Sequence, residues 1–226
     1  MKYGTVIPGK FISRPNRFIA QVETEDGVQV VHVKNTGRCR ELLIPGRIVY
    51  LEKGKNPKRK TLYDLIAVKK GDLMINMDSQ APNKVFGEWA AAGKFLPDVQ
   101  KIRPEYTYGE SRLDFCLETA DGLHFVEVKG VTLEENGAAL FPDAPTERGI
   151  KHIHELQTFV ENGGQATLFF VVQMEGMHSM APNDLTHPAF GEALREAAAH
   201  GVDVQAWGCH VTPDSLEITY PIPVLL

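Results

Sequence analysis

The chain has 226 residues, of which 43% are hydrophobic and 23% are charged, and its formal net charge is −5. This composition is ordinary for a soluble globular protein with one large domain or two smaller ones. The longest apolar run, Leu168–Val172, is far shorter than the roughly 20 residues of a membrane-spanning helix, which excludes a helical membrane protein. Met1–Val6 has no signal-peptide core, and Cys39, Cys116 and Cys209 are too far apart for a zinc or thioredoxin-like motif. We therefore expect a cytoplasmic protein.

The two parts of the chain differ in charge. Residues 1–80 contain 15 Lys and Arg and 8 Asp and Glu, a net charge of +7, whereas residues 81–226 have a net charge of −12. A basic part joined to an acidic part indicates that the basic part contacts nucleic acid and that a cation-binding site would lie in the acidic part. The alternative is that the charges cluster by chance and that they only keep the protein soluble. We predict two domains, residues 1–80 and residues 81–226.

Strand patterns dominate the basic part. Apolar and polar residues alternate as in half-buried strands, and Asp26-Gly27 marks a hairpin turn. We predict a short helix over Arg38–Ile44 and five strands, at residues 18–22, 28–33, 47–51, 62–68 and 73–77. Short strands with an interposed helix are typical of a small β-barrel such as the OB-fold, which often binds nucleic acid.

The most basic segment is a predicted loop at residues 53–60, which has five positive charges in eight residues. Such a loop can follow a phosphate backbone without reading the base sequence, although a solvated loop without a ligand is the alternative. Four arginines lie near turns and could extend the basic track. The predicted DNA contacts are Arg14, Arg17, Arg38, Arg40, Lys53, Lys55, Lys58, Arg59 and Lys60.

The acidic part contains an informative hairpin at residues 112–129. Two alternating segments flank Asp121-Gly122, a strong turn signal. The alternation places Asp114, Glu127 and Lys129 on one face of the hairpin, and Leu113, Phe115 and Leu117 on the other. If the turn is centred on residues 120–121, Asp114 lies opposite Glu127; if it is centred on residues 121–122, Asp114 lies opposite Lys129.

The charged face of this hairpin suits a metal site. Two adjacent carboxylates repel each other unless a proton or a cation lies between them, and oxygen ligands favour Mg²⁺ or Mn²⁺. Lys129 beside the metal could orient a water molecule or stabilise charge on a phosphate. A solvated amphipathic hairpin with an Asp–Lys pair is the alternative.

The other elements predict a mixed α/β sheet. We expect helices at residues 84–94, 146–162 (capped by Thr146 or Asp143) and 188–200 (capped by Thr186), and strands at residues 138–141, 165–173, 202–206 and 216–220. The strand at 165–173 is nearly all apolar, as in a central strand. Gly87–Phe95 is one residue too long for a phosphate loop and lacks its Ser or Thr, which excludes a nucleotide cofactor.

The helix at 146–162 presents a cationic face. Arg148, Lys151 and His152 follow one another at helical spacing and suit a phosphate beside a metal, although an ordinary solvated face is the alternative. His152 and His154 diverge on a helix and cannot bind one metal together. Thr158 stands where a metalloprotease motif needs histidine, which excludes that class.

Several stretches of the chain match one known family in order. They are Arg14–Phe18, His32–Arg38, Pro45-Gly46, Asp114-Phe115, Phe125–Lys129, Ala139–His152 and Phe170–Gln173. Over nearly its full length the chain resembles the sugar fermentation stimulation protein A family of bacteria and archaea. The resemblance implies an OB-like domain followed by a restriction-endonuclease-like core of the PD-(D/E)xK type. It also implies sequence-nonspecific DNA binding and regulation of sugar (maltose) utilisation genes.

The resemblance also implies roles for individual residues. Asp114 and Glu127 would bind Mg²⁺ or Mn²⁺, and Lys129 would serve the attacking water. An acid on the preceding helix often assists the metal in that superfamily, and Glu88 is the candidate here. Leu113 stands where the motif has its proline, which is a common departure. The residues implied to line the site are Arg148, Lys151, His152 and Gln173.

We therefore predict a DNA-binding protein with a Mg²⁺- or Mn²⁺-dependent endonuclease or exonuclease centre. One alternative is a non-catalytic DNA-binding regulator of sugar-utilisation genes. The intact set of Asp114, Glu127 and Lys129 favours the nuclease, although Lys129 could persist as a salt-bridge partner. An RNA-processing enzyme is a third possibility, because OB-folds accept either polymer. Strand preference and oligomeric state do not follow from these residues.

Overall fold

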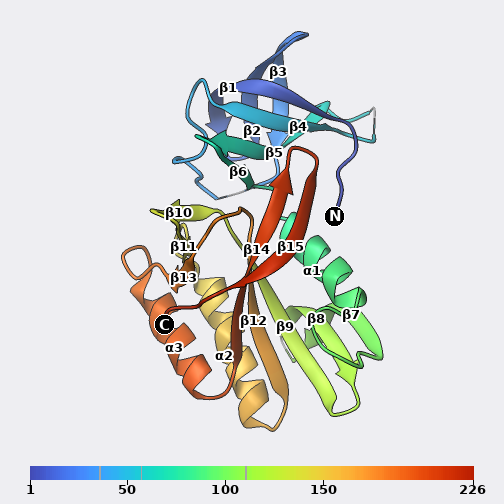
Figure 1. Ribbon diagram of the computed structural model, residues 1–226, viewed down its shortest axis with the longest axis vertical. Helices are drawn as coiled ribbons and strands as arrows, with labels where there is room; N and C mark the ends of the chain where they lie inside the picture. The colour runs from blue at the N-terminus through green and yellow to red at the C-terminus, as the bar shows by residue number, and fades with distance from the viewer. Residues whose placement is uncertain (36, 57, 110) are drawn as a thin grey trace.

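The computed structural model describes residues 1–35, 37–56, 58–109 and 111–226. The predicted basic loop includes Pro57, and the stretch His32–Arg38 includes Thr36, both of which lie outside the described residues. A β-barrel and an α/β unit lie end to end along the longest axis of the molecule (Figure 1). The barrel part contains β1 (Val6–Asn16), β2 (Ile19–Thr24), β3 (Gly27–Val33), β4 (Ile48–Lys53), β5 (Tyr63–Lys70) and β6 (Leu73–Asn76).

The α/β unit follows in the chain. Its helices are α1 (Ala81–Ala91), α2 (Glu147–Glu161) and α3 (Pro188–Ala199). Its strands are β7 (Lys101–Tyr108), β8 (Ser111–Thr119), β9 (Gly122–Val131), β10 (Leu133–Glu135), β11 (Ala138–Phe141), β12 (Gln165–Val172), β13 (Ser179–Pro182), β14 (Asp203–Thr212) and β15 (Ser215–Ile222). In the described part of the chain, no helix is long and apolar enough to cross a membrane.

Five strands close the barrel in the order β1-β2-β3-β5-β4. The closing contact is a short parallel pairing of β3 with β5, in which His32 lies opposite Asp64. Alternate side chains such as Val22, Val31 and Leu65 are fully buried inside the barrel. This arrangement confirms the predicted barrel and has the strand order of an OB-fold.

Three details of the barrel differ from the prediction. Strand β1 was not expected, because Pro8 and Gly9 interrupt its alternation; a side chain at Gly9 would clash with Val22 on β2, at 2.4 Å. Strand β6 was expected in the barrel, but it pairs with β5 alone and leads to the α/β unit. Arg38–Ile44 forms turns instead of a helix, with Cys39 in a left-handed conformation (φ 44°) that breaks helical geometry.

The main sheet of the α/β unit has the order β15-β14-β12-β9-β8-β7. Strands β9, β12 and β14 run parallel, and the outer pairs are antiparallel. The central strand β12 is buried from Ala166 to Val172, as predicted. Strands β7 and β13 were not expected, since Pro104 interrupts β7 and all side chains of β7 are exposed or only partly buried.

Helices cover both faces of this sheet (Figure 1). On one face, Phe86 of α1 packs against Phe115 and Phe169 of the sheet, with ring centroids 5.0 and 4.8 Å apart. On the other face, α2 and α3 bury side chains such as Leu156 and Phe190. The expected mixed α/β fold is therefore confirmed.

The helix starts depend on local polar contacts. Thr146 caps α2, as predicted, because its hydroxyl accepts a hydrogen bond from the Gly149 N–H at 3.1 Å. The predicted cap of α3, Thr186, is wrong. His187 occupies that position, and its Nδ1 accepts a hydrogen bond from the Thr146 N–H at 3.2 Å. The starts of α2 and α3 are thereby held together.

The barrel and the α/β unit share one apolar core. Leu51 and Met77 from the barrel side belong to the same buried cluster as Val172 and Met174 from the end of β12. A backbone hydrogen bond of 3.0 Å from Asn76 to Gln173 joins β6 to the same strand end. Burial of apolar surface at the junction therefore fixes the barrel over one end of the sheet.

Candidate functional site

Asp114 and Glu127 lie beside each other where β8 and β9 stop pairing. The ladder runs from Thr119 opposite Gly122 to Phe115 opposite Val126, so the next pair is Asp114 and Glu127. The turn is therefore centred on residues 120–121, which selects the first of the two predicted registers. The two carboxylates project from neighbouring strands at the barrel end of the sheet.

At Asp114 the backbone pairing of β8 with β9 has ended, and the carboxylate of Asp114 makes hydrogen bonds instead. Its Oδ2 accepts from the Val128 N–H at 2.8 Å, and its Oδ1 accepts from Asn83 Nδ2 of α1 at 2.6 Å. Burial, followed by the negative charge of Glu127, raises the pKa of Asp114 above its usual range. The carboxylate is therefore fixed in position and its charge is poorly compensated.

The prediction that the three charged side chains share one face is only partly right. Phe115 packs under α1, but Leu113 packs with Phe125 in the core under α2 and α3, so the alternation of β8 breaks at Asp114. Pairing with β9 ends there, so β8 no longer has to keep the regular pleat. Asp114 consequently contacts α1, whereas Glu127 contacts α2.

Glu127 is 2% exposed, and its carboxylate lies between the side chains of Lys129 and His152. Its Oε1 accepts hydrogen bonds from Lys129 Nζ, at 2.6 Å, and from His152 Nδ1. Arg148 Nε donates to His152 Nε2 at 3.4 Å, so Nε2 holds a lone pair and Nδ1 holds the proton. Burial alone would raise the pKa of Glu127, but His152 and Lys129 outweigh it and hold the pKa below its usual range.

The second carboxylate oxygen of Glu127 is the feature that suits a cation. Oε2 is buried and has no hydrogen-bond partner among the described residues. In the same part of the chain, no three His, Cys, Asp or Glu side chains are close enough to enclose a metal. Mg²⁺ commonly binds through one or two carboxylates, several waters and substrate phosphates. Asp114 and Glu127 fit that open type of site.

Comparison with known proteins decides the family. The sequence profile described as "Sugar fermentation stimulation protein RE domain" matches residues 80–215, and that described as "SfsA N-terminal OB domain" matches residues 12–77. The sugar fermentation stimulation protein homolog of Desulfitobacterium hafniense (strain Y51) is 55% identical over 96% of this chain and 95% of its own. The chain belongs to the sugar fermentation stimulation protein family. The homolog of Clostridium beijerinckii is 52% identical over the full length of both chains.

A solved structure of the family has the same fold. "The structure of Pyrococcus Furiosus SfsA in complex with Ca2+" superposes with a TM-score of 0.91 and 30% sequence identity, over 100% of this chain and 98% of that chain. Together with the profile match to an OB domain, this similarity confirms the predicted OB barrel and the α/β domain that follows it. The predicted family membership is confirmed as well.

Glu88 lines the same cavity as Asp114, but its carboxylate pairs with the first residue of the chain. The Glu88 carboxylate lies 3.0 Å from the amino nitrogen of Met1, and its side chain is half exposed. On α1 it is Asn83 that reaches Asp114, one turn earlier. Lys151 is exposed, lies 3.8 Å from Glu155 and lines a separate cavity with Tyr108 and Ile150.

Gln173 lies at the junction with the barrel. It is buried, and its Nε2 donates to Asn76 Oδ1 at 2.9 Å and to the carbonyl of Asp78 at 3.1 Å. Its Oε1 lies against Gly130, the residue after Lys129; a side chain there would sit 2.5 Å from that oxygen. Gln173 therefore packs against β9, the strand that carries Glu127 and Lys129. Its side-chain amide donates its hydrogen bonds to Asn76 and Asp78 at the junction with the barrel.

The predicted DNA-contact residues fall into two groups. The Arg14 guanidinium donates to four backbone carbonyls, and Arg59 is bound to the buried carboxylate of Asp64. These two arginines hold their own loops in place. The other predicted contacts have exposed side chains, namely Arg17, Arg38, Arg40, Lys53, Lys55, Lys58 and Lys60.

Sequence reasoning missed Asn83 as a site residue. An asparagine next to a proline at a helix start is typical of a cap, so its contact with Asp114 had no separate signal. Asn83, Lys84 and Asp114 line a cavity of about 650 Å³ beside α1. The carboxylate of Asp114 is therefore open to a ligand from this side.

Proposed function

We propose that this protein binds DNA and cleaves its phosphodiester bonds with Mg²⁺ or Mn²⁺ at Asp114, Glu127 and Lys129. The observation that carries the proposal is the buried Oε2 of Glu127, which has no hydrogen-bond partner in the part of the chain that the structure describes. A buried polar atom without a partner costs about 1–3 kcal/mol, and a cation between the carboxylates would remove that cost. It would also neutralise the negative charge of Glu127, which adds to burial in raising the pKa of Asp114.

The Pyrococcus furiosus relative supports the choice of cation. Its structure is described as a complex with Ca²⁺, and it shares this fold over 98% of its chain. Ca²⁺ and Mg²⁺ are both hard cations that take oxygen ligands, and they differ mainly in ligand number and rigidity. A carboxylate pair that leaves room for water and phosphate suits the smaller ion.

The side chains of the site would have different roles in the reaction. A bound divalent cation would supply Lewis-acid activation of the phosphoryl group and of water. Asn83 and the Val128 N–H hold Asp114 in position, and His152 holds Glu127. Lys129 is 15% exposed, and its ammonium would orient the attacking water and offset the charge that builds on the phosphate. In-line attack by water would leave a 3′-hydroxyl and a 5′-phosphate.

The basic barrel would hold the DNA backbone. Arg17, Arg38 and Arg40 surround a cavity of about 430 Å³ on the barrel, and the exposed lysines of the β4–β5 loop lie on the same domain. Contacts of this kind neutralise phosphates without reading bases. Affinity should therefore fall steeply as the salt concentration rises.

A non-catalytic DNA-binding regulator of sugar-utilisation genes is the second candidate. The ion pair of 2.6 Å between Lys129 and Glu127 favours it, because such a pair stabilises the site even without catalysis. Under this alternative the protein would bind DNA in a salt-dependent manner and would leave it intact.

The two candidates are separated by a cleavage assay. Supercoiled plasmid and single-stranded DNA are incubated with the protein in Mg²⁺, Mn²⁺ or EDTA. Asp114→Ala and Lys129→Ala are compared with Lys101→Ala, a control at an exposed lysine of β7. We expect metal-dependent cleavage by the wild type and the control only. Salt-sensitive binding without cleavage by the wild type would instead support the regulator.

A further inference from the structure

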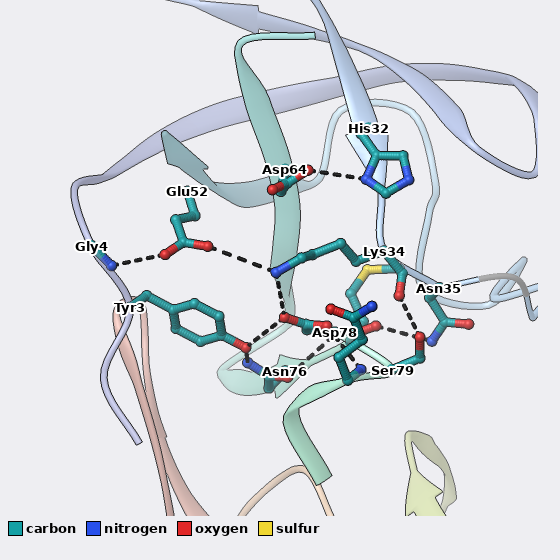
Figure 2. Close-up of polar contacts among 12 residues, drawn as sticks. Tyr3, Gly4, His32, Lys34, Asn35, Glu52, Asp64, Asn76, Asp78 and Ser79 are labelled. Carbon is teal, nitrogen blue, oxygen red and sulfur yellow. Dashed lines mark hydrogen bonds and ion pairs between the residues drawn. The ribbon is translucent and has the colours of Figure 1, made fainter. Parts of the chain in front are cut away.

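A second cavity, of about 450 Å³, lies where the barrel meets α1. Its walls are the start of the β4–β5 loop, the chain start Met1–Gly4 and the first turn of α1. Figure 2 shows its polar floor, in which Lys34 Nζ lies 3.0 Å from Asp78 and 3.8 Å from Glu52. We call it the junction cavity.

The floor of the junction cavity consists of buried side chains that are hydrogen-bonded to one another. Tyr3 Oη donates to Asp78 Oδ2 at 3.3 Å and accepts from Asn76 Nδ2 at 2.8 Å (Figure 2). Asn76 in turn accepts from Gln173 at 2.9 Å. Tyr3, Asn76 and Asp78 are all at most 8% exposed. A strand that enters the junction cavity therefore meets a floor of side chains that are already held by one another.

Cationic side chains outnumber carboxylates around the junction cavity by six to three. The cations are Lys2, Lys34, Lys53, Lys55, Arg59 and Lys84, and the acids are Glu52, Asp64 and Asp78. Lys34 and Arg59 are paired with acids of this set. Lys53, Lys55 and Lys84 make no ion pair within the described residues. In a protein with a net charge of −5, this excess of positive charge indicates an anionic ligand.

The junction cavity also leads to the candidate active site. Gln80 and Lys84 line both this cavity and the cavity that contains Asp114. Around Lys84, α1 begins with no acidic residue in its first turn, so the positive end of its dipole adds to the lysine charge. A ligand fixed by one end in the junction cavity would therefore extend past Lys84 towards Asp114.

We propose that the junction cavity binds the terminal phosphate monoester of a nucleic-acid strand whose following linkages reach Asp114. A monoester carries up to about two negative charges at neutral pH, whereas an internal diester carries one. Three lysines without an ion-pair partner among the described residues thus favour the more highly charged end of a strand over an internal diester. The inference rests on the proposed function for the identity of the strand, and it makes the enzyme one that cuts near a phosphorylated end.

The test compares three single-stranded oligonucleotides of one sequence, which carry a 5′-phosphate, a 3′-phosphate or hydroxyls at both ends. Affinities are measured by fluorescence anisotropy in EDTA, so that no cleavage occurs. We expect one phosphorylated form to bind about tenfold tighter than the hydroxyl form, as one additional charge-assisted contact would give. The 5′ and 3′ arms identify which strand end is recognised.

Three lysine variants locate the effect. Lys84→Gln and Lys55→Gln should each reduce the preference to within about threefold, because each removes one charge from the junction cavity. Lys69→Gln removes an exposed lysine of β5 outside this cavity and should keep the full preference. Lys55, Lys69 and Lys84 are all exposed, so the variants should unfold at the wild-type temperature.

Equal affinity for the three oligonucleotides would overturn the inference, and so would a preference that survives both Lys84→Gln and Lys55→Gln. The assay needs neither metal nor cleavage, so its failure is separate from that of the proposed function. A preserved end preference in a protein that cuts no DNA would refute the nuclease and retain this cavity's role. Cleavage without any end preference would support the nuclease and refute the proposed role of the junction cavity.

Discussion

Gly130→Ala should strain the site because β9 passes very close to two neighbours. A Cβ at Gly130 would lie 2.5 Å from Gln173 Oε1 and 2.6 Å from Pro82 Cγ, well inside the ordinary contact distance of about 3.5–4.0 Å. The proline ring is rigid, and Gln173 is held by hydrogen bonds to Asn76 and Asp78. Overpacking of this kind costs about 1–3 kcal/mol, and two stiff neighbours favour about 2–3 kcal/mol.

The assay is urea unfolding followed by circular dichroism, with Gly4→Ala as the matched control. At Gly4 the nearest atom would be Glu52 Oε1 at 3.6 Å, an ordinary contact, so the free energy of unfolding should change by no more than about 0.5 kcal/mol. Relief of the clash would push α1 outwards and move Asn83 away from Asp114, so cleavage should also fall. If Gly130→Ala unfolds at the same urea concentration as Gly4→Ala, the close packing of β9, α1 and Gln173 is wrong.

Three further predictions concern stability and reactivity. Burial would raise the pKa of Asp64, but hydrogen bonds from Arg59 and His32 hold it below its usual range. This stabilisation is complete above the unfolded pKa of about 3.9 and is lost as the pH falls through the lower folded value. Asp64→Asn should therefore reduce the unfolding free energy by about 3 kcal/mol at pH 7, and a loss that does not shrink as the pH falls below about 3.9 would contradict this reasoning. Phe86→Ala should cost about 3–5 kcal/mol, because the Phe86 ring lies 4.8–5.2 Å from three other aromatic rings; exposed Phe18→Ala is the control in the same urea titration. Burial raises the pKa of Cys39 to about 12, so a thiol reagent at pH 8 should label it only after unfolding, and rapid labelling of the native protein would refute its burial.

Elements with strong local signals could be predicted from the sequence. The hairpin of β8 and β9 follows from its alternation and its Asp-Gly turn, and β12 from its continuous apolar run. The start of α2 follows from the Thr146 cap. In each case the physical cause lies within a few neighbouring residues.

Elements that depend on tertiary contacts could not be predicted. Strand β1 is interrupted by Pro8 and Gly9 and forms because β2 and β4 pair with it on both sides. Strand β7 has no fully buried side chain and forms as the partner of β8. The break at Asp114 arises because pairing with β9 stops there, which the alternation in the sequence does not record.

The roles of charged side chains were the hardest to predict. A basic residue in a turn is typical of a nucleic-acid contact, yet the Arg14 guanidinium is occupied by four carbonyl groups. Conversely, Asn83 stands beside a proline at a helix start, where an ordinary cap is expected, and it donates a hydrogen bond to Asp114. Such roles depend on which distant groups fold against a side chain, so composition and spacing cannot distinguish them.

The most direct test of the central claim is the cleavage rate of Glu127→Gln in Mn²⁺. This variant keeps the size of the side chain but removes the charge of the buried oxygen that we assign to the cation. If Asp114 and Glu127 hold the metal, cleavage should fall by about 100-fold or more while salt-dependent DNA binding is retained. Cleavage within a few-fold of the wild-type rate would place the chemistry elsewhere, and no cleavage by the wild type in any divalent metal would contradict the proposed nuclease.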